Sequence, residues 1–216
     1  KLGAARAAVV VDNNQVALNN LTADVMDGKL AGNATIAFNA RSRSEINADF
    51  TNLDLGKLLA LQGGQVVPVE GQTTGKVNLT FAGTNFKTAS GSLTADITAN
   101  AGTAERGLIP VTGRVEATAA NGLFNVDVAR LTTEKSEFSA TGNFDLNGYN
   151  SNLNIALNSA DAHEIDRIIR VLNLSPEFEQ KANEYKAEFA GTLQFSGTLT
   201  GNVSNPTIDG KASLDS

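Results

Sequence analysis

A strict alternation of apolar and polar residues, with glycine on the apolar side, most constrains how this chain folds. It is clearest in the run GTLQFSGTLTGNVSNPTIDGKASL at residues 191–214. Successive side chains of a strand point to opposite faces, so Leu193, Phe195 and Gly197 share one face while hydroxyl and amide residues share the other. A glycine in an apolar position marks a bend in the sheet or a close approach of backbone or ligand. The run predicts two long strands joined by a turn over residues 201–206, with one apolar face.

The same alternation recurs along most of the chain. Strands are expected over residues 7–11, 15–18, 30–38, 45–50, 75–81, 91–97, 111–117, 124–128, 138–146, 153–157, 189–199 and 208–214. In nearly all of them the second face carries Thr, Asn, Ser, Asp or Lys, as in antiparallel sheets that have one face in water. We therefore expect an all-β fold in which hairpins build an elongated antiparallel sheet.

Two segments change from strand to helix periodicity. A short helix is expected over residues 53–61, with Asn52 as its cap. A helix-turn-helix insertion is expected over residues 161–188, where Asp161 and Glu164 have the spacing of a capping box. The apolar stripe of this insertion either covers the apolar face of the sheet or forms a movable lid or docking helix.

Charge and composition exclude several classes of function. The chain carries a formal net charge of −6, so nucleic acid is not expected as a partner. It has no cysteine, which excludes a disulfide framework and thiolate metal sites and is compatible with the bacterial periplasm. Because the chain begins and ends in strand sequence, we expect residues 1–216 to be a single elongated β-rich fragment of a larger protein.

The apolar face of such a sheet needs a partner. The sheet can close into a barrel, pair with a second sheet, be covered by helices, or stay open around a ligand. A closed sandwich or barrel filled by its own Leu, Ile, Val and Phe is one interpretation. The absence of tryptophan, the glycines in apolar positions and strands of about ten residues favour a strongly curved sheet around a groove.

No pattern of residues indicates catalysis. His163 is the only histidine, and we expect it on the surface of a first helical turn. Carboxylates are expected on the solvated face of the sheet, at Asp96, Glu116, Asp127 and Asp145. A glycosidase pair would lack an aromatic platform for the sugar, and the Gly-Lys pairs lack the spacing of a phosphate loop. We expect no enzyme, no metal site and no cofactor.

Several of these runs resemble the AsmA-like family (AsmA/TamB type) of bacterial envelope proteins. Besides residues 191–214, they are LTADVMDGKLAGNATIAF at 21–38, TNLDLGKLLAL at 51–61 and ARLTTEKSEFSATGNFDL at 129–146. Each run is low in complexity, so the resemblance rests on their repetition over most of the chain. The helical insertion at residues 161–188 departs from the family pattern.

The resemblance implies an elongated, U-shaped sheet with a hydrophobic groove, called a β-taco. It also implies a periplasmic protein whose parent chain is anchored in the inner membrane of a diderm bacterium. The implied function is non-enzymatic binding of phospholipid or other acyl chains during transport between the inner and outer membranes. The alternatives are a TamB-like scaffold that works with an outer-membrane assembly protein, and a structural β-sandwich without ligand.

In this interpretation, acyl chains contact the apolar positions of the strands. Each CH₂ group kept out of water contributes about 0.8 kcal/mol, so a smooth apolar wall can hold a chain without any chemistry. The expected groove residues are Leu30, Ile36, Phe38, Val77, Leu79, Phe81, Leu93, Ile97, Val115, Val126, Phe138, Phe144, Leu153, Ile155, Leu193, Phe195, Ile208 and Leu214.

Overall fold

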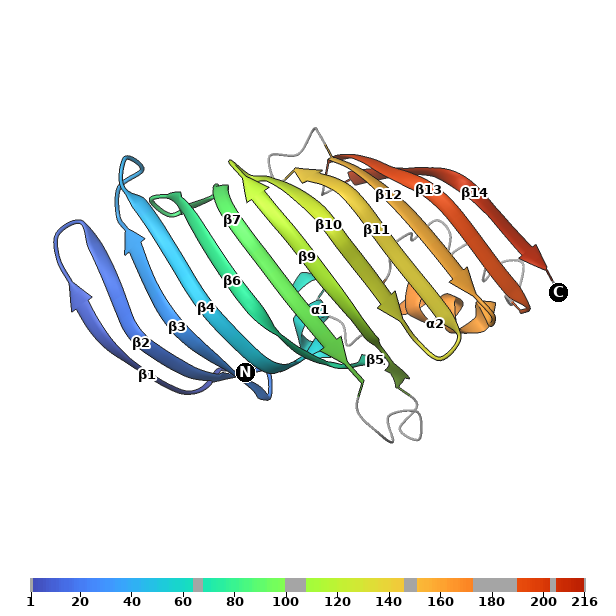
Figure 1. The fold of residues 1–216 in the computed structure, drawn as a ribbon, viewed down its shortest axis with the longest axis horizontal. Coiled ribbons are helices and arrows are strands. Elements are labelled where there is room, and N and C mark those ends of the chain that lie inside the picture. The colour runs from blue at the N-terminus through green and yellow to red at the C-terminus, as the bar shows by residue number, and fades with distance from the viewer. Residues whose placement is uncertain are drawn as a thin grey trace.

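One open antiparallel sheet dominates the computed structural model, which describes residues 2–63, 68–99, 108–145, 151–172, 190–202 and 205–215. Twelve strands lie in the order β1-β2-β3-β4-β6-β7-β9-β10-β11-β12-β13-β14 (Figure 1). They are β1 (Leu2–Val11), β2 (Gln15–Val25), β3 (Gly28–Ala37), β4 (Arg43–Asp54), β6 (Gln72–Ala82), β7 (Asn85–Thr98), β9 (Thr112–Ala120), β10 (Leu123–Thr132), β11 (Ser136–Asp145), β12 (Ser151–Ser159), β13 (Thr192–Asn202) and β14 (Asn205–Asp215).

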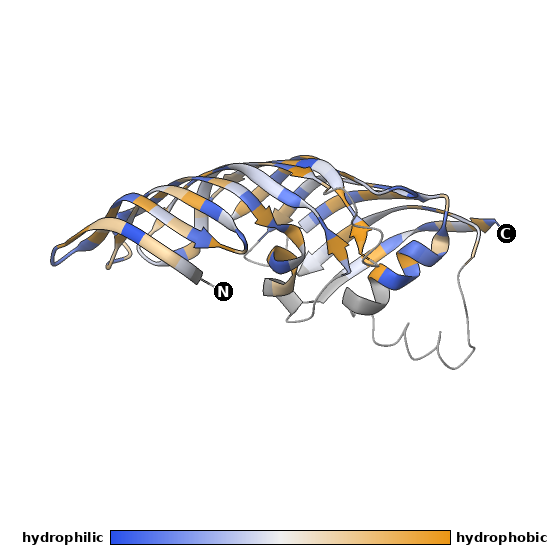
Figure 2. Cartoon of the chain, turned by 90° about the horizontal axis from the view of Figure 1, so that it is seen from below, coloured by the Kyte–Doolittle hydropathy of each residue, from blue (hydrophilic) through white to orange (hydrophobic). Residues whose placement is uncertain are grey.

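The sheet arches over two short helices, α1 (Leu55–Gly63) and α2 (Ala162–Leu172), so both lie on its concave side (Figure 2). A two-residue parallel pair, β5 (Val69–Glu70) with β8 (Ile109–Pro110), lies outside the main sheet. The predicted all-β class and the elongated, curved antiparallel sheet are confirmed. The closed barrel and the two-sheet sandwich are not what the described residues form.

The two long margins of the sheet differ in how their strands are connected. Along one margin, which we call the hairpin-tip rim, tight turns join β1–β2, β3–β4, β6–β7 and β9–β10. Along the other, which we call the helix rim, lie the β2–β3 and β10–β11 turns and the connections that contain α1, β5, β8 and α2. The helices therefore cover the concave face from one side only.

Tips of neighbouring hairpins are tied together by hydrogen bonds. The Gly83 amide donates to the Ser42 carbonyl oxygen over 2.8 Å, which joins the β6–β7 turn to the β3–β4 turn. The fully buried Ser44 hydroxyl accepts from the Ala37 amide at 2.9 Å and donates to the Gly83 carbonyl oxygen. These contacts satisfy buried polar groups at the margin, where the strand ladder no longer does so.

Curvature comes partly from asparagine bulges, which the alternation pattern did not predict. The register shifts in β2 and β4 lie next to Asn20 and Asn52, which have positive φ values of 52° and 57°. In both bulges a side chain of the adjacent strand accepts a hydrogen bond from the amide that the ladder leaves free. Asn20 N donates to Asn33 Oδ1 at 2.9 Å, and Asn52 N donates to Thr74 Oγ1 at 3.1 Å. Bulges of this kind bend a strand and increase its twist.

Glycines in the apolar phase mark close approaches between strands, as expected. A Cβ on Gly75 in β6 would stand 1.9 Å from the Thr94 carbonyl oxygen of β7 and 2.7 Å from Cζ of Phe50 in β4. The Phe50 ring therefore fills the space that the missing side chain leaves. Glycine at this position lets a large ring lie flat on a tightly paired sheet.

The short helix begins later than predicted, at Leu55 and not at residue 53. Leu53 still pairs with Thr73 in the sheet, so β4 continues to Asp54. The Asp54 carboxylate accepts from the Lys57 amide at 2.8 Å, which makes Asp54 the cap. Asn52 forms the bulge instead, so the prediction of Asn52 as cap was wrong.

The second helix confirms the first part of the expected insertion. Asp161 caps α2, since its Oδ1 accepts from the His163 amide at 3.1 Å. The Glu164 carboxylate does not complete a capping box, because it accepts from the Thr133 hydroxyl, and the Asp161 amide donates to Ser159 Oγ. The remainder of the predicted insertion, residues 173–188, lies outside the described residues.

We expect Gly75→Ala to lower the free energy of unfolding by about 1–3 kcal/mol, because the new methyl group overpacks a paired site. Urea unfolding followed by circular dichroism would measure this loss. Gly3→Ala in the edge strand β1 is the matched control, since its nearest neighbours stand at 3.0 Å and 3.2 Å. Equal unfolding midpoints for the two variants would contradict this account of Gly75.

Candidate functional site

The concave face is a continuous apolar surface built by the strand register. Apolar side chains of neighbouring strands are direct partners, and they share the face on which α1 and α2 pack. One such row crosses the sheet through Ala48, Val77, Leu93, Ala117, Val126, Gly142, Leu153, Leu199 and Ile208. No charged residue interrupts this row over nine consecutive strands.

All of the expected groove residues except Phe38 lie in strands on this face, but they differ in exposure. Leu79, Phe81 and Ile97 are buried, whereas Phe38, Ile208 and Leu214 are 54%, 56% and 45% exposed. The half-buried residues are Leu30, Ile36, Val77, Leu93, Val115, Val126, Phe138, Phe144, Leu153, Ile155, Leu193 and Phe195. Most of the face is therefore accessible to a ligand, and its contact with lipid stays a prediction.

At the helix rim the concave face is closed by a compact apolar cluster. Leu55 of α1 packs with Val69, Ile97, Ile109 and Val111. From the other side, Ile168 of α2 and Leu131 of β10 pack against the same cluster. The small β5–β8 pair thus joins the two helices into one wall, although they are about a hundred residues apart in sequence.

This wall contains the elements that sequence reasoning missed. The expected strand at residues 111–117 begins at Thr112, and Val111 belongs to the cluster instead. The signal was a repeated motif, in which proline lies beside β-branched residues at Pro68–Val69 and again at Ile109–Pro110–Val111. A proline in a two-residue parallel pair is tolerated because little of the ladder depends on its missing amide.

A bulge in β10 also changed which residues reach the concave face. The expected alternation Phe124, Val126, Val128 holds only as far as Val126. The register then shifts, so Val128 pairs with Glu116 on the convex face while Ala129 and Leu131 take the concave positions. The prediction that Val128 shares the apolar face was wrong, because one extra residue inverts the alternation.

At the β13–β14 end an aromatic ring covers a pair of glycines. Gly197 and Gly210 face each other across the two strands, and a Cβ on either would meet the Phe195 ring at 2.7–2.8 Å. The ring therefore lies low over the backbone instead of projecting outward. This arrangement keeps the apolar surface shallow where the outermost strand, β14, is exposed along residues 207–215.

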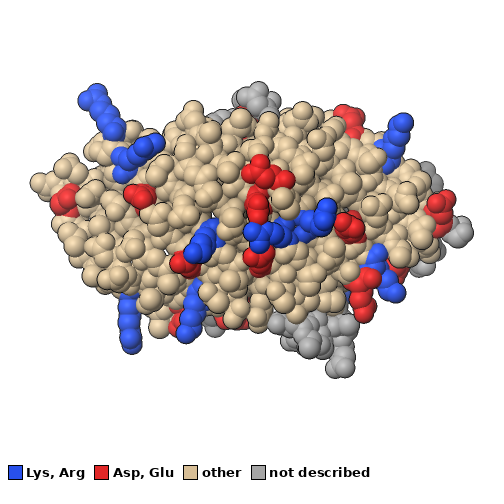
Figure 3. Space-filling model, viewed as in Figure 1, with Lys and Arg blue, Asp and Glu red and all other residues tan. Residues whose placement is uncertain are grey.

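The convex face is polar, and its charges pair with one another. Figure 3 shows that acidic and basic side chains gather in a band across the middle of this face. The band contains the ion pairs Lys76–Asp49 at 3.4 Å, Arg114–Asp96 at 2.7 Å, Arg114–Glu116 at 2.6 Å and Arg130–Glu137 at 3.5 Å. Glu116 and Asp96 raise the pKa of Arg114 by accepting hydrogen bonds from its guanidinium group.

These pairs link β4 to β6, β7 to β9 and β10 to β11 and favour their register, although each exposed pair contributes little by itself. Asp96, Glu116 and Asp127 lie on the convex face as expected. Asp145 is instead buried, since it is only 5% exposed, and its amide donates a hydrogen bond to Ser151 Oγ. The prediction of a solvated carboxylate at Asp145 was wrong, since the end of β11 is buried.

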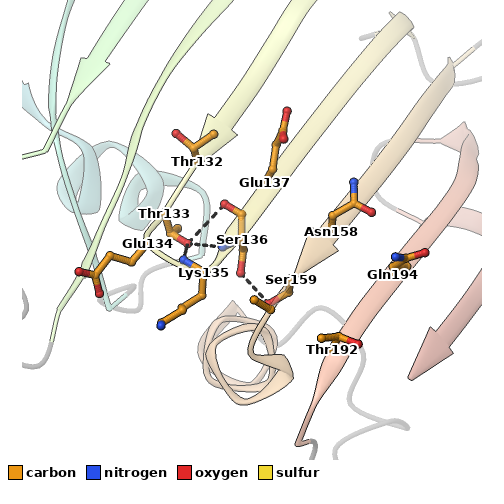
Figure 4. Close-up of a pocket in the computed structure, with 11 residues that line it drawn as sticks. Thr132, Thr133, Glu134, Lys135, Ser136, Glu137, Asn158, Ser159, Thr192 and Gln194 are labelled. Atoms are coloured by element: carbon orange, nitrogen blue, oxygen red, sulfur yellow. Dashed lines mark hydrogen bonds between the residues drawn. The ribbon is translucent and has the colours of Figure 1, made fainter. Parts of the chain in front are cut away.

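A polar recess of about 520 Å³ lies near the helix rim, between the β10–β11 turn and strands β12 and β13 (Figure 4). Thr133 organises it, because its hydroxyl oxygen accepts from the Ser136 amide at 2.9 Å and the Lys135 amide at 3.2 Å. Ser136 Oγ donates to Ser159 Oγ at 2.8 Å. These hydroxyls are engaged in holding the turn and the start of α2, and no histidine lines the recess.

His163 and the acidic residues form no metal centre in the described part of the chain. His163 is exposed on the first turn of α2, as expected. Among the residues whose side chains are placed, no group of three His, Cys, Asp or Glu side chains is positioned to hold a metal ion. Neither described helix is long and apolar enough to cross a membrane.

Comparison with known proteins does not identify a family: no family model, no curated protein and no solved structure matches this chain. The apolar concave face and its closed helix rim are therefore the features from which a function has to be argued.

Among the described residues of the wall at the helix rim, the Thr73 hydroxyl is buried without a hydrogen-bond partner, and it lies in register between Leu53 and Ile97. We expect Thr73→Val to raise the free energy of unfolding by up to about 1 kcal/mol, because it removes an unsatisfied hydroxyl at nearly constant shape. Thr74→Val is the matched control. It should destabilise by about 0.5–1.5 kcal/mol, since Thr74 Oγ1 accepts from the Asn52 amide. Urea midpoints that move in the same direction would contradict this assignment.

Proposed function

We propose that this chain is a non-enzymatic lipid-binding segment of an AsmA-like envelope protein. Its concave face holds the acyl chains of phospholipids while the headgroups stay in water beyond the hairpin-tip rim. In the cell it acts in the periplasm of a diderm bacterium, as part of a path for phospholipid between the inner and outer membranes. This proposal joins the sequence resemblance to the shape and polarity of the sheet.

The observation that carries the proposal is the extent of the half-buried apolar surface. A soluble protein rarely leaves a large contiguous apolar patch without a partner, and such patches mark ligand or interaction sites. Here the helices cover one margin, and half-buried side chains continue from Leu30 in β3 to Phe195 in β13. An apolar ligand of variable length is the partner that a long, uniform surface of this kind fits.

The dimensions support the same ligand class. Strands spaced ~4.8 Å apart make the sheet of twelve strands about 50 Å long, more than one extended acyl chain needs. Each buried CH₂ group contributes about 0.8 kcal/mol, so a chain of ordinary length gains enough to leave water. Because the surface offers similar apolar contacts along its length, a bound chain can shift along it without a large barrier.

The edge strands favour a second candidate function, a TamB-like scaffold for outer-membrane protein assembly. β1 and β14 each have a strand on one side only. Arg6 is the only charged residue in β1, and β1 contains no proline. Its ladder with β2 shifts register between Leu2 and Ala5 and between Arg6 and Ala8, so the regular part of this edge is Ala8–Val11. A β-strand of a partner could add to this edge by β-augmentation.

The lipid-binding proposal is tested by replacing Leu153 and Leu199, which are half-buried partners on the concave face. We expect protein expressed in a diderm host to carry phospholipid that native mass spectrometry detects. In the double variant Leu153→Asp with Leu199→Asp, the bound lipid should fall at least about tenfold, because two carboxylates cannot be placed against acyl chains without a large desolvation cost.

The matched control is Asn154→Asp with Thr198→Asp, which are direct partners in the same two strands but lie on the convex face. It adds the same two facing charges, so it reproduces their repulsion without touching the concave face. Circular dichroism verifies that both variants fold. Wild-type protein that folds but carries no lipid, or equal loss in the control, would refute the proposal.

A further inference from the structure

The exposed hydrophobic side chains of this protein are concentrated on the hairpin-tip rim. Nine large apolar residues are exposed in the described part of the chain, and three of them, Leu59, Ile208 and Leu214, lie outside the four turns that define this rim. The other six lie within three residues of those turns: Val9, Val10, Val11, Phe38, Phe86 and Leu123. The most exposed at three successive tips are Val11 at 66%, Phe38 at 54% and Phe86 at 45%.

These side chains are not extensions of a packed core. Phe38 follows the last residue of β3 and stands at the tip of the β3–β4 hairpin. Phe86 touches Phe81 edge to face, with ring centroids 5.6 Å apart, and still leaves nearly half of its surface in water. Leu123, at 37% exposed, begins β10 directly after the Asn121–Gly122 turn. Each tip thus offers an exposed apolar group at or just past the end of a strand.

Charge separates the two rims of the sheet. Within the described residues, the hairpin tips carry three basic side chains, Arg41, Arg43 and Lys87, against three acidic ones, Asp12, Glu45 and the buried Asp145 at the end of β11. Asp12 is occupied by the Asn14 and Gln15 amides, at 2.7 Å and 2.9 Å. The helix rim is acidic, with Asp24, Asp27, Asp54, Glu134, Asp161, Glu164 and Asp166 against Lys29, Lys57, Lys135 and Arg167. In a chain of net charge −6, the hairpin-tip rim is therefore the margin least repelled by an anionic surface.

We propose that the hairpin-tip rim binds the surface of a lipid bilayer. Phe38, Phe86 and Leu123 enter the boundary between headgroups and acyl chains, where aromatic and aliphatic side chains are stabilised. Arg41, Arg43 and Lys87 contact lipid phosphates, each adding to the attraction toward anionic lipid. The acidic helix rim then points away from the membrane, so charge and apolar surface select the same orientation.

This inference does not depend on the proposed carriage of lipid, because the rim would hold the protein at a bilayer whatever the concave face binds. The two also have separate readouts: lipid that co-purifies with the protein reports on the concave face, and vesicle binding reports on the rim. A second copy of the chain is the other occupant that apolar tips could accept. A bilayer fits better because basic side chains flank the tips, which would repel one another across a symmetric contact.

The chain lacks tryptophan, which allows a direct test by fluorescence. Phe38→Trp places a single indole at a hairpin tip, and Leu59→Trp places one at the exposed position on α1. With vesicles of phosphatidylcholine and phosphatidylglycerol in equal parts, we expect the emission of Phe38→Trp to shift to the blue. The emission of Leu59→Trp should stay unchanged, because the helix rim remains in water.

Co-sedimentation with the same vesicles measures the contribution of each kind of side chain. Phe38→Ser with Leu123→Ser should weaken binding about tenfold or more, through lost apolar contact. Arg41→Gln with Arg43→Gln should weaken it about fivefold per residue, and only on vesicles that contain phosphatidylglycerol. Leu59→Ser is the control, since Leu59 is exposed, lies away from the rim and is not one of the expected groove residues.

Three results would overturn the proposal. Wild-type protein that does not sediment with the vesicles of phosphatidylcholine and phosphatidylglycerol excludes a membrane-binding rim. Equal loss of binding in the Leu59→Ser control shows that the contact lies elsewhere. If size-exclusion chromatography shows a wild-type dimer that Phe38→Ser with Leu123→Ser converts to a monomer, the tips join two copies of the chain instead.

Discussion

The structure depends on an apolar sheet face that the described helices cover along one margin only. Twelve strands place Leu, Ile, Val and Phe on one side in matching register, while the described helices add only α1 and α2 to that side. The hydrophobic effect would normally bring a second layer onto such a face. Here the coverage is confined to the helix rim, where Leu55 and Ile168 meet the strands. The rest of the face stays half exposed, and its exposure is the physical reason for assigning it a ligand.

The sheet and its apolar face were predictable from the sequence because side chains in a strand alternate with a period of two. Alternation identified the apolar face, because any residue in the correct phase must point to it. It failed where one residue is inserted, as in β10, where a bulge places Val128 on the convex face. It also failed where a polar residue has a tertiary role, as at Asn52, which forms a bulge and does not cap the helix. The two bulges and the burial of Asp145 have no signature in the local sequence. Each depends on hydrogen-bond partners and side chains that a neighbouring strand contributes.

The small elements were the hardest to foresee, although they close one margin of the candidate site. β5 and β8 are two residues each, too short for any periodicity, and they pair only because the chain returns to the same margin after β7. Their side chains nevertheless connect α1 to α2 through Val69, Ile109 and Val111. The candidate ligand-binding surface was thus predictable as a set of strand residues, whereas its boundary was not. The boundary results from contacts between segments distant in sequence.

The direction of the hydrogen bonds has a mechanical consequence. In an antiparallel sheet these bonds run perpendicular to the strands, and here the strands follow one another along the long axis of the molecule and slant across it (Figure 1). A force that pulls the two edge strands apart therefore has a component along the bonds, so a strand pair can peel open from the end where the load enters. The hairpin that contains β1 and the hairpin that contains β14 would then detach before the middle of the sheet is disturbed. Under tension we expect the sheet to lose strand pairs from its two ends inward. The strands that contact α1 and α2 should separate last.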